Sequence, residues 1–69
     1  DPKSLVQEIA QSRYKVTPNY RVLSESGPAH ERIFRVGLYF NGDLKAEGEG
    51  NSKQEAETEA AKILLQELR

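Results

Sequence analysis

The chain has 69 residues, enough for one small domain that buries only about 60% of its unfolded surface. It has no cysteine, which excludes disulfides and thiolate metal sites, and no apolar run long enough to span a membrane. The formal net charge is −1, with seven Lys/Arg against five Asp/Glu in residues 1–45 and three against six in residues 46–69. Any contact with phosphates would therefore come from a few placed cations and not from the overall field.

The first segment predicts a helix from Asp1 to about Arg13. Asp1 suits the N-cap and Pro2 suits the first helical position. An apolar stripe recurs at helical spacing: Leu5, Val6, Ile9 and Ala10. The opposite side is polar: Ser4, Gln7, Glu8 and Gln11. Pro18 cannot lie inside this helix and marks the connection to the next element.

The middle of the chain predicts three strands, at about residues 19–26, 32–40 and 43–49. Apolar side chains there hold even positions, which is the period of a sheet with one buried face: Tyr20, Val22, Phe34, Val36, Leu38, Phe40, Leu44 and Ala46. Asn41-Gly42 is the favoured centre of a two-residue type I′ hairpin. Short links between consecutive strands indicate an antiparallel meander.

The last segment predicts a helix from Ser52 to about Leu68. Ser52 and Glu55 form a capping box, in which each can satisfy a backbone amide of the other. The side chains expected to face inward recur at helical spacing: Ala56, Ala60, Ile63, Leu64 and Leu68. The predicted fold class is therefore α+β, in the order α-β-β-β-α, with two helices packed on one face of a three-stranded antiparallel sheet.

Several local motifs occur together in an order that resembles the double-stranded RNA-binding domain. They are the α-β-β-β-α order, Gly27-Pro28-x-His30, Gly48-x-Gly50-x-Ser52-Lys53 and the pair Ala60-Ala61. The segment 1–8 and Pro18-x-Tyr20 are similar to the C-terminal domain of bacterial ribonuclease III. The chain does not begin with methionine, so we expect the whole of 1–69 to be one such domain from a longer protein.

The resemblance implies three RNA-binding segments. As a class, these domains span about 16 base pairs, contacting two minor grooves and the phosphates between them. The first helix would enter one minor groove through Ser4, Gln7, Glu8 and Gln11. The loop of Gly27, Pro28, Ala29 and His30 would enter the next groove. The segment of Asn51, Ser52, Lys53 and Gln54 would hold the intervening phosphates, at a helix N-terminus that attracts anions.

Each of these segments also has a simpler interpretation. The polar side of the first helix could be an ordinary solvated face. His30 could be an exposed histidine without a function, and Lys53 could be an ordinary solvated lysine. The related family usually has a second lysine where this chain has Gln54, and Glu57 would repel a phosphate. Lys45 and Lys62 are weaker candidates for phosphate contact.

Catalysis by this chain is not expected. The acidic pairs Glu47/Glu49 and Glu55/Glu59 are typical of solvated surfaces, and a single histidine cannot complete a metal site. The resemblance implies a parent endoribonuclease whose Mg²⁺ belongs to a catalytic domain absent from this chain, so no cofactor is expected here. The expected partner is double-stranded RNA, with no membrane and no small-molecule ligand.

A homodimeric parent and a cytoplasmic location are also expected from the resemblance. The alternative function is a protein-interaction or dimerisation module on the same fold, with weak or no RNA binding. Ile33, Arg35 and Tyr39 would then serve the partner, because they should lie on the sheet face that the helices leave open.

Overall fold

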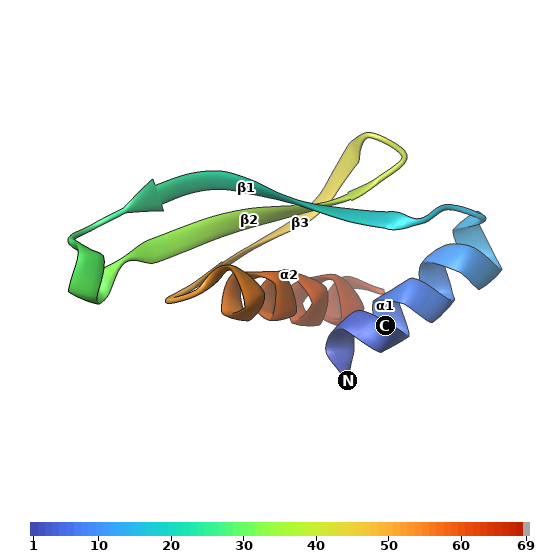
Figure 1. Ribbon diagram of the computed structural model, residues 1–69. Coiled ribbons are helices and arrows are strands. Elements are labelled where there is room, and N and C mark those ends of the chain that lie inside the picture. The colour runs from blue at the N-terminus through green and yellow to red at the C-terminus, as the bar shows by residue number, and fades with distance from the viewer. Residues whose placement is uncertain (69) are drawn as a thin grey trace.

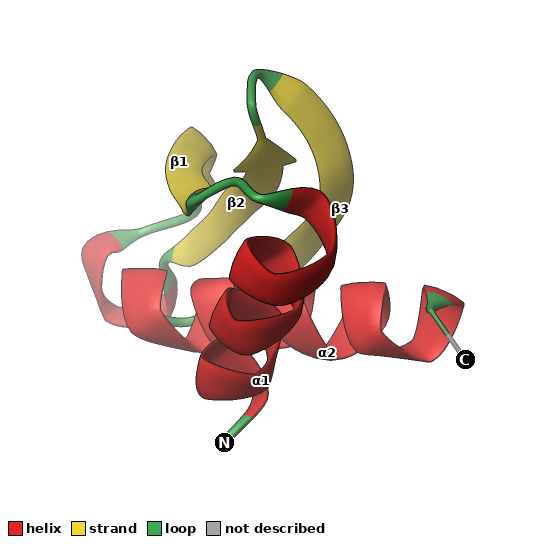
Figure 2. Cartoon of the chain, turned by 90° about the vertical axis from the view of Figure 1, so that its right-hand side faces the viewer, coloured by secondary structure: helices red, strands yellow, loops and turns green. Residues whose placement is uncertain are grey.

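The computed structural model describes residues 1–68 and consists of a three-stranded sheet with two helices on one side (Figure 1). The elements are α1 (Pro2–Ile9), β1 (Pro18–Ser26), β2 (Ile33–Phe40), β3 (Asp43–Gly50) and α2 (Lys53–Glu67). The strands are antiparallel in the order β1-β2-β3. Viewed after a 90° turn, the sheet and the helices form two layers (Figure 2). The predicted fold class is confirmed.

The first helix reaches the predicted length, but its last part is wound differently. Ala10–Tyr14 is a π-helical turn, and it ends at Lys15, whose φ of 58° is left-handed. The carbonyl of Ala10 accepts from the amides of both Lys15 and Val16. At the other end, the Asp1 carboxylate accepts from the Ser4 amide at 2.9 Å, which confirms Asp1 as the N-cap.

The core lies between the sheet and the two helices. Its fully or nearly fully buried members come from α1, the π-helical turn, β2, β3 and α2: Val6, Ala10, Leu38, Phe40, Ala46, Ala60, Ala61 and Leu64. Tyr20, Val16, Leu65 and Leu68 pack against this cluster while partly exposed. No helix in the described part, residues 1–68, is long and apolar enough to cross a membrane.

Two of the even-numbered strand residues are not buried as predicted. Leu44 is 48% exposed, because Tyr39 pairs with Leu44 while Leu38 pairs with Ala46, so Lys45 is an extra residue that reverses the alternation. Val22 keeps the core-facing register opposite Val36 but is 42% exposed. Strand β1 is an edge strand, and α2 packs over β2 and β3, which leaves Val22 uncovered.

Three further burial predictions were wrong or only partly met. Leu5 is 49% exposed, because this part of the chain joins the core cluster through Val6 of α1 and Ala10 of the π-helical turn. On α2, Ile63 is exposed and Ala61 takes its place in the core, since the helix faces β3 closely along its small residues. Phe34 is half-buried, at the end of β2 where it pairs with Gly50.

Of the two predicted local motifs that join these elements, the hairpin turn is present and the capping box is partly formed. Asn41 and Gly42 both have positive φ, 51° and 87°, which is the requirement of a type I′ turn. The Ser52 hydroxyl accepts from the Glu55 amide at 3.1 Å and caps α2. Among the described residues the reciprocal bond from the Ser52 amide to the Glu55 carboxylate is not formed, so the capping box is half made.

Candidate nucleic-acid interface

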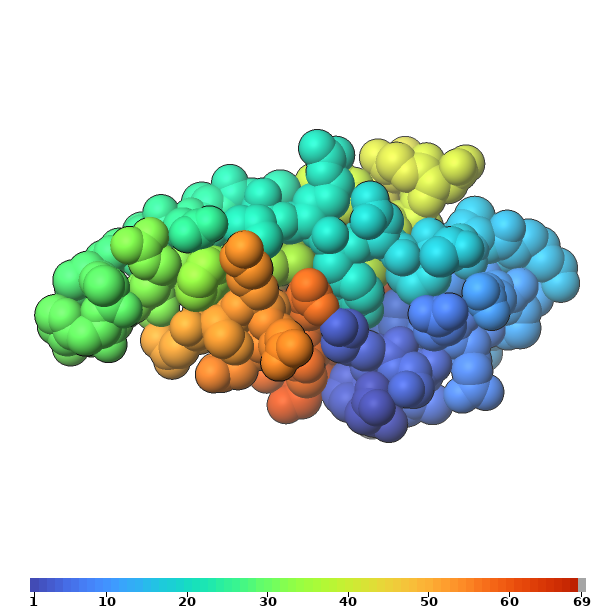
Figure 3. All heavy atoms as spheres, viewed as in Figure 1, coloured from blue at the N-terminus to red at the C-terminus, as the bar shows by residue number. Residues whose placement is uncertain are grey.

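The three predicted segments lie apart along the length of the molecule, which measures 40 × 22 × 16 Å. The 27–30 loop lies at one end and α1 at the other, with the start of α2 between them (Figure 1). The space-filling view shows all three on one side of the molecule, as green, orange and blue surfaces in that order (Figure 3). They form a row and not a single pocket.

The α1 polar face is formed by Ser4, Gln7 and Glu8 of α1 together with Gln11 of the π-helical turn, and it is exposed throughout. The Ser4 hydroxyl donates to the Asp1 carboxylate at 3.1 Å and retains its acceptor capacity. A shallow hollow is lined by four residues of this region: Lys3, Ser4, Gln7 and Glu8. Amide and hydroxyl groups of this kind can both donate to and accept from a partner that carries hydroxyl groups.

The 27–30 loop is exposed and tightly turned. Gly27 has φ 86°, and a Cβ atom there would lie 2.7 Å from the Glu31 carbonyl oxygen, so only glycine fits. The residues Ala29–Glu31 form one turn of 3₁₀ helix, in which the Glu31 amide donates to the Pro28 carbonyl at 2.9 Å. This turn lies at one end of the molecule (Figure 1), and His30 within it is exposed.

The segment 51–54 forms the entry to α2. Lys53 and Gln54 are exposed in the first turn of the helix, where free backbone amides favour anions. Ser52 is half-buried, and its hydroxyl is already engaged as the cap. The Asn51 side chain donates to the Arg32 carbonyl at 3.4 Å, which ties this segment to the residues that follow the 27–30 loop.

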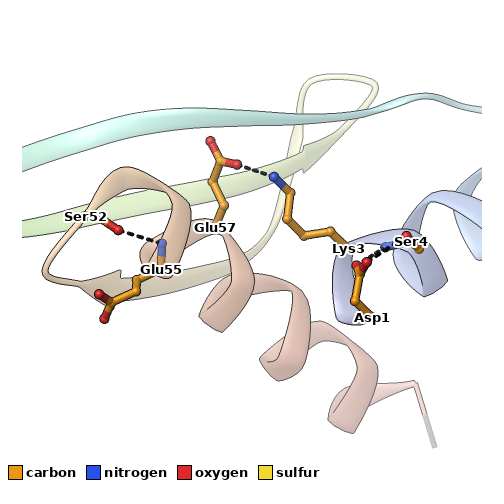
Figure 4. A network of polar contacts seen from close by, with 6 residues as sticks. All are labelled: Asp1, Lys3, Ser4, Ser52, Glu55 and Glu57. Atoms are coloured by element: carbon orange, nitrogen blue, oxygen red, sulfur yellow. Dashed lines mark hydrogen bonds and ion pairs between the residues drawn. The ribbon is translucent and has the colours of Figure 1, made fainter.

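One ion pair in this region escaped prediction. The Lys3 ammonium of α1 binds the Glu57 carboxylate of α2 (Figure 4). It also lies 5.1 Å from the centroid of the Tyr20 ring. Burial, and to a lesser degree the charge of Glu57, raises the pKa of Tyr20 to about 12. No sequence spacing could reveal a contact between residues 54 positions apart.

The pairing changes the interpretation of Glu57, which was expected to repel a phosphate. Its charge is offset by Lys3, so the entry to α2 carries less negative charge than the sequence suggests. Lys53 has no ion-pair partner among residues 1–68. Lys62, a weaker candidate, pairs with Glu59 at 3.2 Å in the same helix. Lys45, the other weak candidate, is the extra residue in β3.

The open face of the sheet, away from the helices, carries a different set of groups. Arg35 binds both Glu47, at 2.9 Å, and Glu49, and its hydrogen bond to Glu47 is the main reason that the pKa of Arg35 is raised. The predicted exposure of Ile33 and Arg35 is confirmed, and Tyr39 is half-buried there.

Apolar side chains of the open face gather over one glycine. A Cβ at Gly37 would lie within 3.1 Å of side-chain atoms of Tyr39, Leu23 and Leu44. Arg21 lies over the Tyr39 ring, with its guanidinium carbon 5.4 Å from the centroid. Neither this face nor any other part of residues 1–68 holds a cluster of three His, Cys, Asp or Glu side chains suited to a metal ion.

A family model described as "Double-stranded RNA binding motif" matches residues 2–68. Ribonuclease 3 of Syntrophomonas wolfei is 48% identical over 67 residues, covering 97% of this chain and 29% of that protein. Ribonuclease 3 of Myxococcus xanthus is 48% identical over 69 residues, covering all of this chain and 26% of that protein. The chain thus spans little more than a quarter of these curated relatives.

Solved structures show the same fold. A structure of HYL1 from Arabidopsis, described together with its implications for miRNA processing, is 34% identical. It superimposes with a TM-score of 0.79, covering 97% of this chain and 94% of that one. Dicer from Pichia stipitis is 26% identical with a TM-score of 0.78, covering 96% of this chain and 32% of that one.

Proposed function

This chain belongs to the double-stranded RNA-binding motif family, and from that membership we propose that it binds duplex RNA by shape. The α1 polar face enters one minor groove, and the 27–30 loop enters the next minor groove along the same side of the duplex. The segment 51–54 holds the phosphates between the two grooves. Recognition then depends on 2′-hydroxyl groups and A-form geometry, with little preference for base sequence.

The observation that carries this proposal is the row of three exposed segments along one side of the molecule (Figure 3). Two minor grooves with phosphates between them need three contacts in a row, not one concave pocket. The chemistry of each segment supports the same assignment. The two ends offer amide, hydroxyl and imidazole groups, and the middle offers Lys53 at a helix N-terminus.

We further propose that the parent protein is an endoribonuclease of the ribonuclease 3 type. The support is the identity of about 48% to proteins of that name over the whole of this chain. In such a parent this domain presents the duplex to a separate catalytic region, where Mg²⁺ would act. The chain itself supplies binding and positioning, and needs no cofactor for that role.

A second function is favoured by the open face of the sheet. Leu23, Tyr39 and Leu44 expose apolar surface there, and helices α1 and α2 lie on the other side. A protein partner on that face would leave the row of RNA-binding segments untouched. The two functions therefore predict amide shifts in different places.

The test is a titration of the isolated domain with an RNA duplex of about 18 base pairs at low salt, followed by amide chemical shifts. A DNA duplex of the same sequence is the matched control, because it lacks the 2′-hydroxyl groups and the A-form minor groove. We expect shifts near Gln7, His30 and Lys53 with RNA and much weaker ones with DNA. No shift with either duplex would reject RNA binding and leave the open face as the functional surface.

A further inference from the structure

The first turn of α1 is only weakly held by the core. None of the first five residues is buried, and Leu5 is among the most exposed apolar side chains. The helix meets the core later, through Val6 and Ala10. The angle at which the α1 polar face points away from the molecule therefore depends on contacts outside the core.

Lys3 provides such a contact. Its ammonium reaches from α1 to Glu57 on α2 (Figure 4). It also lies over the ring of Tyr20 on β1, so one side chain contacts two other elements. The side chains of Lys3 and Glu57 are 40% and 25% exposed, so water screens the pair only in part. A cation over an aromatic ring adds a further favourable contact.

Glu57 follows Lys53 by four residues, so the two side chains lie on the same side of α2, one turn apart. By its charge alone, Glu57 would weaken phosphate binding at the entry to α2. In the structure it instead pairs with Lys3, and Lys53 makes no ion pair with any residue from 1 to 68. Glu57 thus links α1, which carries the proposed minor-groove contact, to α2, whose start carries the proposed phosphate contact.

We propose that Lys3 and Glu57 form a positioning pair, which fixes the α1 polar face relative to the start of α2 so that both meet one duplex together. This inference rests on the proposed RNA binding and makes Glu57, an acid beside the phosphate site, a residue that promotes binding. Lys3 acts through Glu57 and is not required to touch RNA.

One substitution distinguishes the positioning pair from a pure charge effect, because the two predict opposite changes in RNA affinity. Glu57→Gln removes a negative charge with little change of shape, so charge alone predicts tighter RNA binding. The positioning pair predicts binding weaker by about two- to fivefold, the range of a partly exposed ion pair. It also predicts that RNA-induced amide shifts shrink near Gln7 and Gln11 while those near His30 persist.

Glu59→Gln is the matched control. It makes the same charge change on the same helix, where Glu59 pairs only locally with Lys62. We expect this variant to bind RNA as well as the wild type or slightly better. Amide spectra recorded without RNA establish that each variant is folded before any affinity is compared.

The double variant Lys3→Gln with Glu57→Gln has the net charge of the wild type and provides a second test. The positioning pair predicts that it binds as weakly as Glu57→Gln, whereas opposing charge effects would return it to wild-type affinity. Unchanged or tighter binding by folded Glu57→Gln, or wild-type binding by the double variant, overturns the inference. If the wild type itself fails to bind RNA, the proposed function fails instead, so the two failures are distinguishable.

Discussion

Lys53 is the residue that we expect to contribute most to phosphate binding. It is exposed at the first position of α2, and no carboxylate within residues 1–68 pairs with it. Since Gln54 brings no charge, Lys53 is the cation of the segment 51–54. Its contribution adds to the partial positive charge of the helix N-terminus.

Lys53→Ala should therefore weaken RNA binding without unfolding the domain. We expect the slope of log affinity against log salt to decrease in magnitude by about 1, equally for RNA duplexes of different sequence. The free energy of unfolding should stay within about 0.5 kcal/mol of the wild type. Lys62→Ala is the control, since it removes the same charge from the same helix. Equal losses for the two variants would show that net charge, and not position, governs affinity.

Gly48 shows how closely α2 approaches the sheet. A Cβ there would lie 2.3 Å from the Ala60 amide nitrogen and 2.4 Å from the Ala56 carbonyl oxygen, and both atoms belong to the backbone. Neither can move aside without shifting the helix. The small residues Ala56, Ala60 and Gly48 thus set the distance between α2 and β3.

Gly48→Ala should lower the free energy of unfolding by about 1–3 kcal/mol or more, because overpacking forces the two layers apart. Gly42→Ala is the comparison: the space around it is open, but its φ of 87° costs about 1–2 kcal/mol for a residue with a Cβ. Urea midpoints measure both. A smaller loss for Gly48→Ala than for Gly42→Ala would contradict the close approach of helix and sheet.

At the scale of elements, the start of α2 has two tasks: it caps the first backbone amides of the helix, and in the proposed function it also faces the phosphates. The Ser52 hydroxyl meets the first task by accepting from the Glu55 amide. The backbone amides that it leaves uncapped remain available for the second. Substitutions at Ser52 can separate the two tasks, because N-cap preference and charge vary independently among Asn, Asp and Ala.

Ser52→Ala should lose about 1 kcal/mol of stability, the usual value of an N-cap. Ser52→Asp keeps the cap but places a negative charge beside the phosphates, so it should retain stability while weakening RNA binding. Ser52→Asn should retain stability and lose less affinity than the aspartate. Thermal unfolding and RNA titration of the three variants test this pattern. A stable aspartate variant with wild-type affinity would remove this segment from the phosphate contacts.

Most elements could be predicted from local signals. The alternation from Ile33 to Phe40, the Asn41-Gly42 turn and the caps at Asp1 and Ser52 each depend on neighbouring residues alone. The exposure of Leu44 could not be predicted, since a bulged strand has the same apparent alternation as a regular one. The π-helical turn at Ala10–Tyr14 likewise has no sequence signal that we recognise.

At the scale of the whole molecule, charge and shape impose opposite conditions on binding. The net charge of −1 gives no general attraction to a polyanion, while in the proposed binding mode the 40 Å length would spread three contacts along a duplex. Affinity would then depend on correct alignment of all three segments more than on charge. In the proposed mode, a mildly acidic domain would thus bind a duplex mainly by shape.

The salt dependence of RNA binding should accordingly be shallow. Each neutralised phosphate of B-form DNA contributes a slope of about −0.9 in a plot of log affinity against log salt, and we take a similar value for duplex RNA. With Lys53 as the main phosphate cation, we expect a slope between about −1 and −3. Affinity measured from 50 to 200 mM salt gives this value. A slope steeper than about −5 would require many more phosphate contacts than the segment 51–54 provides.

The candidate site was less predictable than the fold. Its three segments could be located only through family resemblance, because Gln7, His30 and Lys53 each fit an ordinary exposed side chain. The roles of the individual residues remain predictions. The pair Lys3 and Glu57 could not be found from sequence at all, since its partners meet only after α1 folds against α2.

The extra residue in β3 has a consequence for insertions and deletions. Leu44 already faces the open side of the sheet, and Ala46 faces the core. Removal of Lys45 would make Leu44 and Ala46 adjacent, with the alternation of a regular strand. Removal of Glu47 would instead bring Ala46 and Gly48 together, although both now face the core, and would turn one of them away. Strand β3 therefore has one site where its length can change by a residue while every remaining side chain keeps its side of the sheet.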